Sequence, residues 1–249
     1  MTFDLLTLLL LFATGLTAGC VDAIAGGGGL ISLPILLSLG ISPAQTLATN
    51  KLQSSIGTSM ACYSYWKHGL VHLNQLKIPI FFTFLGSIIG SYTVGFLDGA
   101  LLDKVIPYLL IAFALYFTFS PRISDSDSQQ RISLTIFGLF IGTSVGFYDG
   151  FFGPGTGSFF TIGFIILLGY NLKHATANTK VLNLTSNLAA LSIFIFGGHV
   201  LWHLGLIMAA GQIIGARIGA QLAVNKGVRL IKPVLIIVSI AMSIKLLIE

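Results

Sequence analysis

Long runs of this chain are apolar on every face that a helix could present. Examples are the runs from Leu5 to Phe12 and from Ile132 to Val145. A helix that is apolar all round lies inside a membrane or a large core, whereas the strands of a membrane β-barrel alternate apolar and polar residues. These runs therefore predict membrane-spanning helices rather than strands.

The scarcity of charge supports this prediction. Charged residues make up 8% of the 249 residues, whereas soluble domains carry roughly 25%. So few charges cannot cover a water-facing surface of this size. The 55% of hydrophobic residues excludes a disordered chain, and the 13 Lys and Arg residues are too scattered for nucleic-acid binding. We expect an all-α polytopic membrane protein, with the lipid bilayer around it and no nucleic acid as a partner.

Ten apolar segments predict eight to ten membrane segments. A polar stretch, SPRISDSDSQQR, separates a first membrane repeat at 1–119 from a second at 132–249, with the linker at 120–131. The second segment of each set of five is too short to span a membrane and follows a glycine-rich stretch, which is typical of broken or re-entrant helices. The segments are 3–24, 30–39, 44–66, 76–97, 104–119, 132–152, 158–169, 174–197, 201–222 and 229–248.

The two halves match each other in sequence. GCVD followed by GGG parallels GFYD followed by GPG, ATNK parallels ANTK, and GSIIG parallels GQIIG, while Pro107 parallels Pro233. All four matches occur in the same order with nearly the same offset. They predict an internal duplication, in which Asp22 corresponds to Asp149 and Lys51 to Lys180.

The charges in the loops predict that the duplication is inverted. If each half crosses the membrane an odd number of times, seven Lys and Arg residues share the side of the linker and two lie opposite, whereas a parallel repeat gives five against four. The positive-inside rule then predicts a cytoplasmic linker and both termini outside. The seven are Lys67, Lys77, Arg122, Arg131, Lys226, Arg229 and Lys232, and the two are Lys104 and Lys245.

Five ionisable residues lie inside apolar segments, where each costs several kcal/mol unless it faces a partner or a cavity. They are Asp22, Lys51, Asp149, Lys180 and Arg217. One interpretation is structural: each aspartate pairs with a lysine and holds the broken helices together. The other is functional: both lysines charge one central anion site, and the aspartates orient them or carry a coupling proton. Arg217 has three readings, as an anion contact, as a partner of an aspartate, or as a residue that reaches the membrane interface.

Hydrogen-bond donors near the two lysines extend the predicted site. Amide side chains can donate to an anion, and a helix N-terminus that follows glycine presents free N–H groups to one. The alternative is that these glycines only allow close helix packing, which we prefer for Gly86, Gly90, Gly211 and Gly215. The predicted substrate-binding set is Lys51, Lys180, Asn50, Asn178, Asn183, Gly28, Gly29, Gly155, Gly157 and Ser158.

The chain shows no motif of an enzyme. Ser158 with His174 or His199 downstream matches no hydrolase signature, and no His-Glu-x-x-His metal motif is present. Cys20 and Cys62 lie in apolar segments, which indicates packing rather than a metal site or a disulfide. We therefore expect no catalytic residues, no metal and no cofactor. The site predicts secondary transport of a small anion, with an anion channel, a transporter of a small carboxylate and a purely structural role as alternatives.

The sequences GCVDAIAGGGGLISLP and ATNKLQ in the first half resemble the signature of the TauE/SafE family of membrane transporters. So do GFYDGFFGPGTGSFF, ATANTKVLN, GQIIGARIGA and KPVLIIVSI in the second half, and the likeness is greatest to the YfcA-like bacterial members. The resemblance implies a multi-pass transporter of the bacterial inner membrane, built from two repeats. It also implies a small inorganic or organosulfonate anion as partner, such as sulfite or sulfoacetate, with export as the direction. A homodimer is one of the assemblies that the sequence leaves open.

Overall fold

The computed structural model describes residues 4–96 and 127–227, and the regular elements in these two ranges are all helical. Asp4 caps the first helix, because its Oδ1 accepts a hydrogen bond from Thr7 N. The helices are α1 (Leu5–Ala25), α2 (Gly29–Ser38), α3 (Pro43–Lys67), α4 (Lys77–Val94), α6 (Leu134–Phe137), a π-helical turn (Gly138–Gly142), α7 (Thr143–Phe151), α8 (Thr156–Leu168), α9 (Leu172–Phe196) and α10 (Trp202–Lys226), with a 3₁₀ turn at Leu73–Gln75.

Each predicted segment within the described ranges corresponds to a helix, with bounds that differ by a few residues. The largest difference is at α10, which continues to Lys226, beyond the predicted end at 222. The predicted segments 104–119 and 229–248 lie outside the described residues, and so does most of the linker. All-helical architecture is therefore confirmed for the part that the structure describes.

Five helical stretches of the described ranges are long and apolar enough to cross a membrane: α1, α4, 134–151, α9 and α10. The short helices α2 and α8 have 10 and 13 residues. At 1.5 Å per residue they extend about 15 and 20 Å, short of a hydrocarbon core of about 30 Å. The remaining long helix, α3, has 25 residues but carries many buried polar side chains, so it lies inside the bundle.

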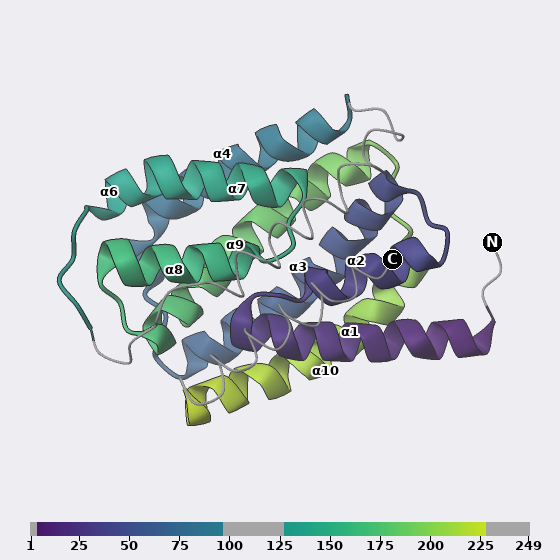
Figure 1. Cartoon of the computed structure of the whole chain (residues 1–249), viewed down its shortest axis with the longest axis horizontal. Coiled ribbons are helices and arrows are strands. Elements are labelled where there is room, and N and C mark those ends of the chain that lie inside the picture. Colours follow the sequence, from purple (N-terminus) through teal and green to yellow (C-terminus); the bar gives the residue numbers. More distant parts are fainter. Residues whose placement is uncertain (1–3, 97–126, 228–249) are drawn as a thin grey trace, which may run out of the picture.

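The long helices pack against one another in pairs. α1 packs along α10, α4 packs along α7, and α3 and α9 pack against each other between these pairs (Figure 1). Glycines allow the close approach: a Cβ at Gly90 would lie 2.0 Å from Phe147 O, and one at Gly215 would lie 1.9 Å from Leu16 O. Gly90 and Gly215 correspond to each other in the predicted duplication, and both face the neighbouring backbone, as expected for packing residues.

Helices that correspond to each other in the predicted duplication run in opposite directions in Figure 1. α1 runs from right to left and α7 from left to right, and α3 and α9 are likewise antiparallel. Within each pair that joins the halves, the helices are parallel: Gly15 and Gly19 of α1 face Met208 and Gln212 of α10 in the same order. α4 and α7 are parallel in the same way, since Gly86 and Gly90 of α4 face Thr143 and Phe147 of α7 in the same order.

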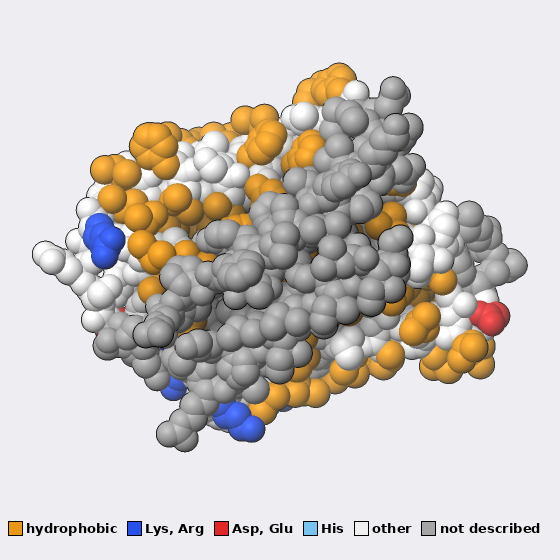
Figure 2. Space-filling model, viewed as in Figure 1, with side chains coloured by type: hydrophobic (Ala, Val, Ile, Leu, Met, Phe, Trp, Pro, Cys, Tyr) orange, Lys and Arg blue, Asp and Glu red, His pale blue; other side chains and the backbone are white. Residues whose placement is uncertain are grey.

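Basic side chains outside the core gather at one end of the bundle, where α3 and α10 end and α4 and α9 begin (Figure 2). At the opposite end, the described ranges contain Asp4 and no Lys or Arg. Much of the surface between the two ends is apolar, as a lipid-facing surface requires. The basic residues are Lys67, Lys77, Arg131, Lys173, Arg217 and Lys226.

Candidate functional site

Two buried ion pairs lie at the centre of the bundle. Lys51 Nζ on α3 lies 2.9 Å from Asp149 Oδ1 on α7, and Lys180 Nζ on α9 lies 3.3 Å from Asp22 Oδ2 on α1. Each pair joins a lysine of one half to an aspartate of the other. In the predicted duplication the two lysines correspond to each other and so do the two aspartates, so the two pairs are corresponding contacts.

The Asp149 carboxylate is enclosed by hydrogen-bond donors. Thr156 Oγ1 donates to Asp149 Oδ1 at 2.7 Å, and Ser186 Oγ donates to Asp149 Oδ2. Lys51 Nζ also donates to Asn187 Oδ1 at 3.1 Å. The Lys51 and Asp149 side chains are each 2% exposed, so this pair depends almost entirely on protein partners. A buried charge is tolerable only when it is paired and hydrogen-bonded in this way.

The Asp22 carboxylate is less well enclosed. Lys180 Nζ donates to both Asp22 Oδ2 and the Asp22 carbonyl oxygen, and Thr58 Oγ1 lies at the long distance of 3.5 Å from Oδ2. The Asp22 side chain is 11% exposed, against 2% for Asp149. Thr58 occupies the position that corresponds to Asn187, but Asn187 contacts the lysine of its pair and Thr58 lies near the aspartate. The surroundings of the two pairs therefore differ.

Breaks in two helices hold the aspartates in place. α1 ends at Gly26, whose positive φ of 79° lets its N–H donate back to Asp22 O. The second break contains Gly153 and Gly155, with φ of 99° and 79°. Glycine adopts such angles without the strain that a side chain adds. The two breaks touch, because a Cβ at Gly26 would lie 2.5 Å from Gly157 Cα.

The glycines and the serine that were predicted to bind substrate instead contact other parts of the protein. A Cβ at Gly28 would lie 2.8 Å from Ala18 O, and one at Gly29 would lie 3.3 Å from Pro154 Cα. Ser158 Oγ donates to Ala25 O at 2.7 Å, across the two halves. In this conformation, close packing accounts for these positions, and their role in binding stays a prediction.

Of the three predicted asparagines, Asn183 and Asn50 form hydrogen bonds with other buried side chains, whereas Asn178 lies elsewhere. Asn183 Oδ1 accepts from Asn187 Nδ2 at 3.3 Å, which connects it to Lys51. Asn50 Oδ1 accepts from Ser32 Oγ at 2.6 Å and from Gln53 Nε2 at 2.9 Å.

Asn178 instead lines a hollow of about 400 Å³ at the basic end, beside His72 and His174. Its Nδ2 donates to His174 O at 2.7 Å. The structure therefore does not bring Asn178 to the ion pairs, although only one residue separates it from Lys180 in sequence.

Arg217 also lies away from the pairs. It is exposed on α10 and lines a separate hollow with Lys67 and His68. In the described ranges, the ion-pair partners of Asp22 and Asp149 are the two lysines. Conversely, Thr156 and Ser186 are contacts of Asp149 that the sequence analysis missed. Thr156 lies in the glycine-rich break, so the motif GPGTGS was the available signal, but nothing local marked Ser186.

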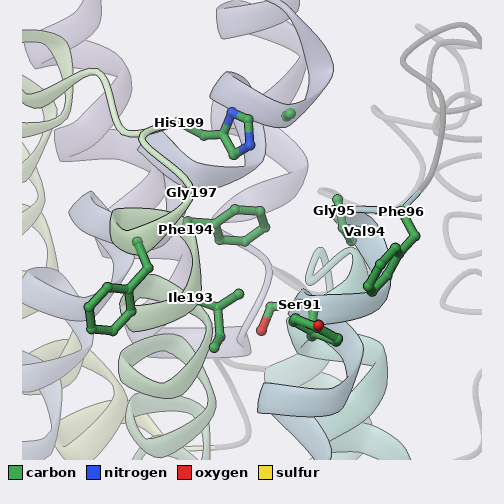
Figure 3. A pocket seen from close by; sticks show the side chains of 11 residues that line it. Ser91, Val94, Gly95, Phe96, Ile193, Phe194, Gly197 and His199 are labelled. Carbon is green, nitrogen blue, oxygen red and sulfur yellow. The ribbon is translucent and has the colours of Figure 1, made fainter.

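A larger hollow, of about 660 Å³, lies between the ends of α4 and α9 and does not reach the ion pairs. Its walls are mainly apolar, with Ser91 and His199 as polar members (Figure 3). Apolar walls suit a lipid chain or an apolar side chain better than a small anion. No group of three or more His, Cys, Asp or Glu residues gathers in the described ranges as metal ligands would.

Comparisons with known proteins decide the family. The family described as sulfite exporter TauE/SafE matches residues 11–246. The chain belongs to this family. A probable membrane transporter protein of Haemophilus influenzae is 44% identical over 239 residues, which cover 96% of this chain and 94% of the relative.

The probable membrane transporter protein YfcA of Escherichia coli is 45% identical over 237 residues, covering 95% of this chain and 88% of the relative. A probable membrane transporter protein of Methanocaldococcus jannaschii is 30% identical, with 88% of each chain covered. No solved structure matches the chain. The family resemblance expected from the motifs is thus confirmed, and the chain is a membrane transporter by family.

Proposed function

We propose that the protein is a secondary transporter of a small anion of the sulfite or organosulfonate class, which acts by alternating access. The observation that carries the proposal is the pair of crossed, buried lysine–aspartate contacts between the two halves. Ionisable residues inside a membrane protein mark transport pathways by default, because burying them costs too much to serve no purpose. The family description, which names sulfite export, supports the substrate class.

Each lysine already holds an oxyanion. Lys51 Nζ binds the Asp149 carboxylate at 2.9 Å and has the Asn187 side chain beside it. An oxygen of sulfite or of a sulfonate can take the place of that carboxylate if Asp149 becomes protonated. The proton neutralises the aspartate, and an anion of charge −1 then neutralises the lysine, so the buried centre has no net charge before the exchange and none after it. Coupling of anion movement to a proton follows from this exchange.

The two halves are proposed to form an inverted repeat. The antiparallel course of α3 and α9 and the exchange of equivalent ion pairs support this arrangement. The basic residues at one end of the bundle support a cytoplasmic linker, with both termini outside and the bacterial inner membrane as the location. In this arrangement α2 and α8 enter the membrane without crossing it, and the touching glycine breaks form the midplane.

Transport in proteoliposomes tests the proposal. Purified protein is reconstituted, and uptake of sulfite, sulfoacetate, sulfate, phosphate, taurine and acetate is measured with and without a pH gradient. We expect saturable transport of sulfite or sulfoacetate that responds to the gradient and is lost in Lys51→Met and Lys180→Met. Lys173→Met, at the beginning of α9, is the matched control and should transport normally.

The other outcomes separate the alternatives. Preference for acetate would indicate a carboxylate transporter, and non-saturable flux near channel rates would indicate an anion channel. Full activity in the double variant Lys51→Met/Asp149→Leu would show that the pair only holds the helices together, and the proposed mechanism would be wrong.

A further inference from the structure

The hollow that contains Arg217 lies outside the proposed transport pathway. It has a volume of about 400 Å³ and lies between the last turns of α3 and the C-terminal half of α10. Lys67, His68 and Arg217 are exposed there, and no acidic residue is among its described lining residues. Its polar lining residues are Tyr63, Ser64, Lys67, His68, Arg217 and Gln221. The hollow is therefore a basic pocket with hydroxyl and amide groups that can also bind an oxyanion.

The surroundings of this hollow indicate the level of the membrane interface. Tyr63 and Trp66 are 55% and 56% exposed, and their ring centroids lie 6.2 Å apart. Exposed tyrosine and tryptophan are typical of the boundary between lipid and water. α3 ends at Lys67, one residue beyond Trp66, so the helix leaves the bilayer at this level.

The α10 side of the hollow continues into a lipid-facing surface. Ile214 and Ile218, on either side of Arg217, are 46% and 44% exposed. Exposed isoleucines in a membrane protein lie against acyl chains. Arg217 thus lies where an apolar surface meets a basic pocket, and its long side chain can keep its stem in the lipid and its guanidinium at the headgroups.

From this arrangement we infer that the hollow binds the phosphate of an anionic phospholipid. Lys67 and Arg217 face the phosphodiester, and the acyl chains lie along Ile214 and Ile218. Basic pockets between membrane helices on the cytoplasmic side bind anionic headgroups in this way, and Arg presents a planar fork that matches phosphate. The inference rests on the proposed cytoplasmic position of the basic end, but not on the proposed transport of an anion, because it uses none of the buried ion-pair residues.

Lipid binding to the purified full-length chain tests the inference. The protein is delipidated in detergent, and binding of phosphatidylglycerol and of phosphatidylcholine is titrated by native mass spectrometry. We expect preferential binding of phosphatidylglycerol. Arg217→Gln and Lys67→Gln should each weaken that binding by about fivefold, since one basic residue near an anionic surface contributes about 1 kcal/mol. Lys77→Gln removes an exposed charge at the same end of the bundle and should leave the affinity unchanged.

Soluble anions distinguish the source of the phosphate. Inorganic phosphate and glycerol 3-phosphate lack acyl chains, so neither should displace phosphatidylglycerol at equal concentration. Displacement by either would show a site for a soluble anion and overturn the assignment to lipid. Binding of phosphatidylcholine as tight as that of phosphatidylglycerol would show that the hollow does not select an anionic lipid. Unchanged affinity for phosphatidylglycerol in the double variant Arg217→Gln/Lys67→Gln would show that the lipid binds elsewhere. Either result would overturn the inference. Both side chains are exposed, so the variants should fold, and an unchanged unfolding midpoint without added lipid checks this.

Discussion

Removing one partner of the Lys51–Asp149 pair should destabilise the protein far more than removing both partners. Lys51→Met leaves the Asp149 carboxylate buried with hydrogen bonds from Thr156 and Ser186 but no positive charge. Asp149→Leu leaves the Lys51 ammonium with Asn187 and no negative charge. The double variant Lys51→Met/Asp149→Leu contains neither charge. Together with the native chain, the three variants form a thermodynamic cycle that isolates the interaction of the two side chains.

The expected magnitude follows from the geometry. Two unit charges at the 2.9 Å separation of Nζ and Oδ1 attract each other by about 6 kcal/mol at an effective dielectric constant of about 20. Part of this is offset by the desolvation of both groups, and breaking a buried pair typically costs about 3–5 kcal/mol. We expect the free energy of unfolding of each single variant to fall by that amount. The free energy of unfolding of the double variant should return to nearly the native value. The coupling should be smaller for Lys180 and Asp22, because their separation is 3.3 Å and Asp22 is 11% exposed.

Thermal unfolding in detergent at a fixed scan rate provides the assay, with folding checked by size-exclusion chromatography. Single variants should unfold at a midpoint lower by on the order of 10 °C, and the double variant should lie close to the native chain. Lys77→Met, which changes an exposed lysine, is the control and should stay within about 0.5 kcal/mol of it. This reasoning would be refuted if the free energy of unfolding of the single variants fell by less than about 1 kcal/mol. It would also be refuted if the loss in the double variant equalled the sum of the two single losses.

Two further predictions test packing and topology. Gly90→Ala should destabilise the protein by about 1–3 kcal/mol in thermal unfolding, because its Cβ would lie 2.0 Å from Phe147 O. Gly95→Ala, whose nearest contact would be 3.3 Å, should be tolerated. In a variant without native cysteines, a cysteine at Gln75 should react with a membrane-impermeant thiol reagent only from the cytoplasm, and one at Ser38 only from outside. The same side for both would show that α3 does not cross the membrane and would contradict the proposed topology.

Which segments are helical could be predicted from local information. Apolar runs of about 20 residues and glycine-rich breaks are properties of neighbouring residues, so the sequence marked α1, α2 and α8 within a few residues of their bounds. The candidate residues Asp22 and Lys51 could also be predicted, because an ionisable side chain in an apolar segment is costly wherever the chain folds. The internal duplication stays a prediction, which rests on four matches in the same order.

The partners of these residues could not be predicted, because they depend on contacts between distant segments. Lys180 and Asp22 are 158 residues apart, and no local pattern shows that each lysine pairs with the aspartate of the other half. Helix geometry explains the misplaced Asn178: two residues correspond to about 200° around a helix, so Asn178 faces away from Lys180. Ser186 reaches Asp149 for the same kind of reason, since only the packing of α7 against α9 brings them together.

The sequence alone thus determined that this chain is a helical membrane protein with charged residues inside its apolar segments, and it predicted two related halves. The tertiary structure decided that these charges neutralise one another across the two halves, and that Arg217 lies at the surface instead. The physical reason is the range of the interactions. Hydrophobic length and backbone breaks act along the chain, whereas a buried charge takes whichever partner the packed helices bring within hydrogen-bonding distance.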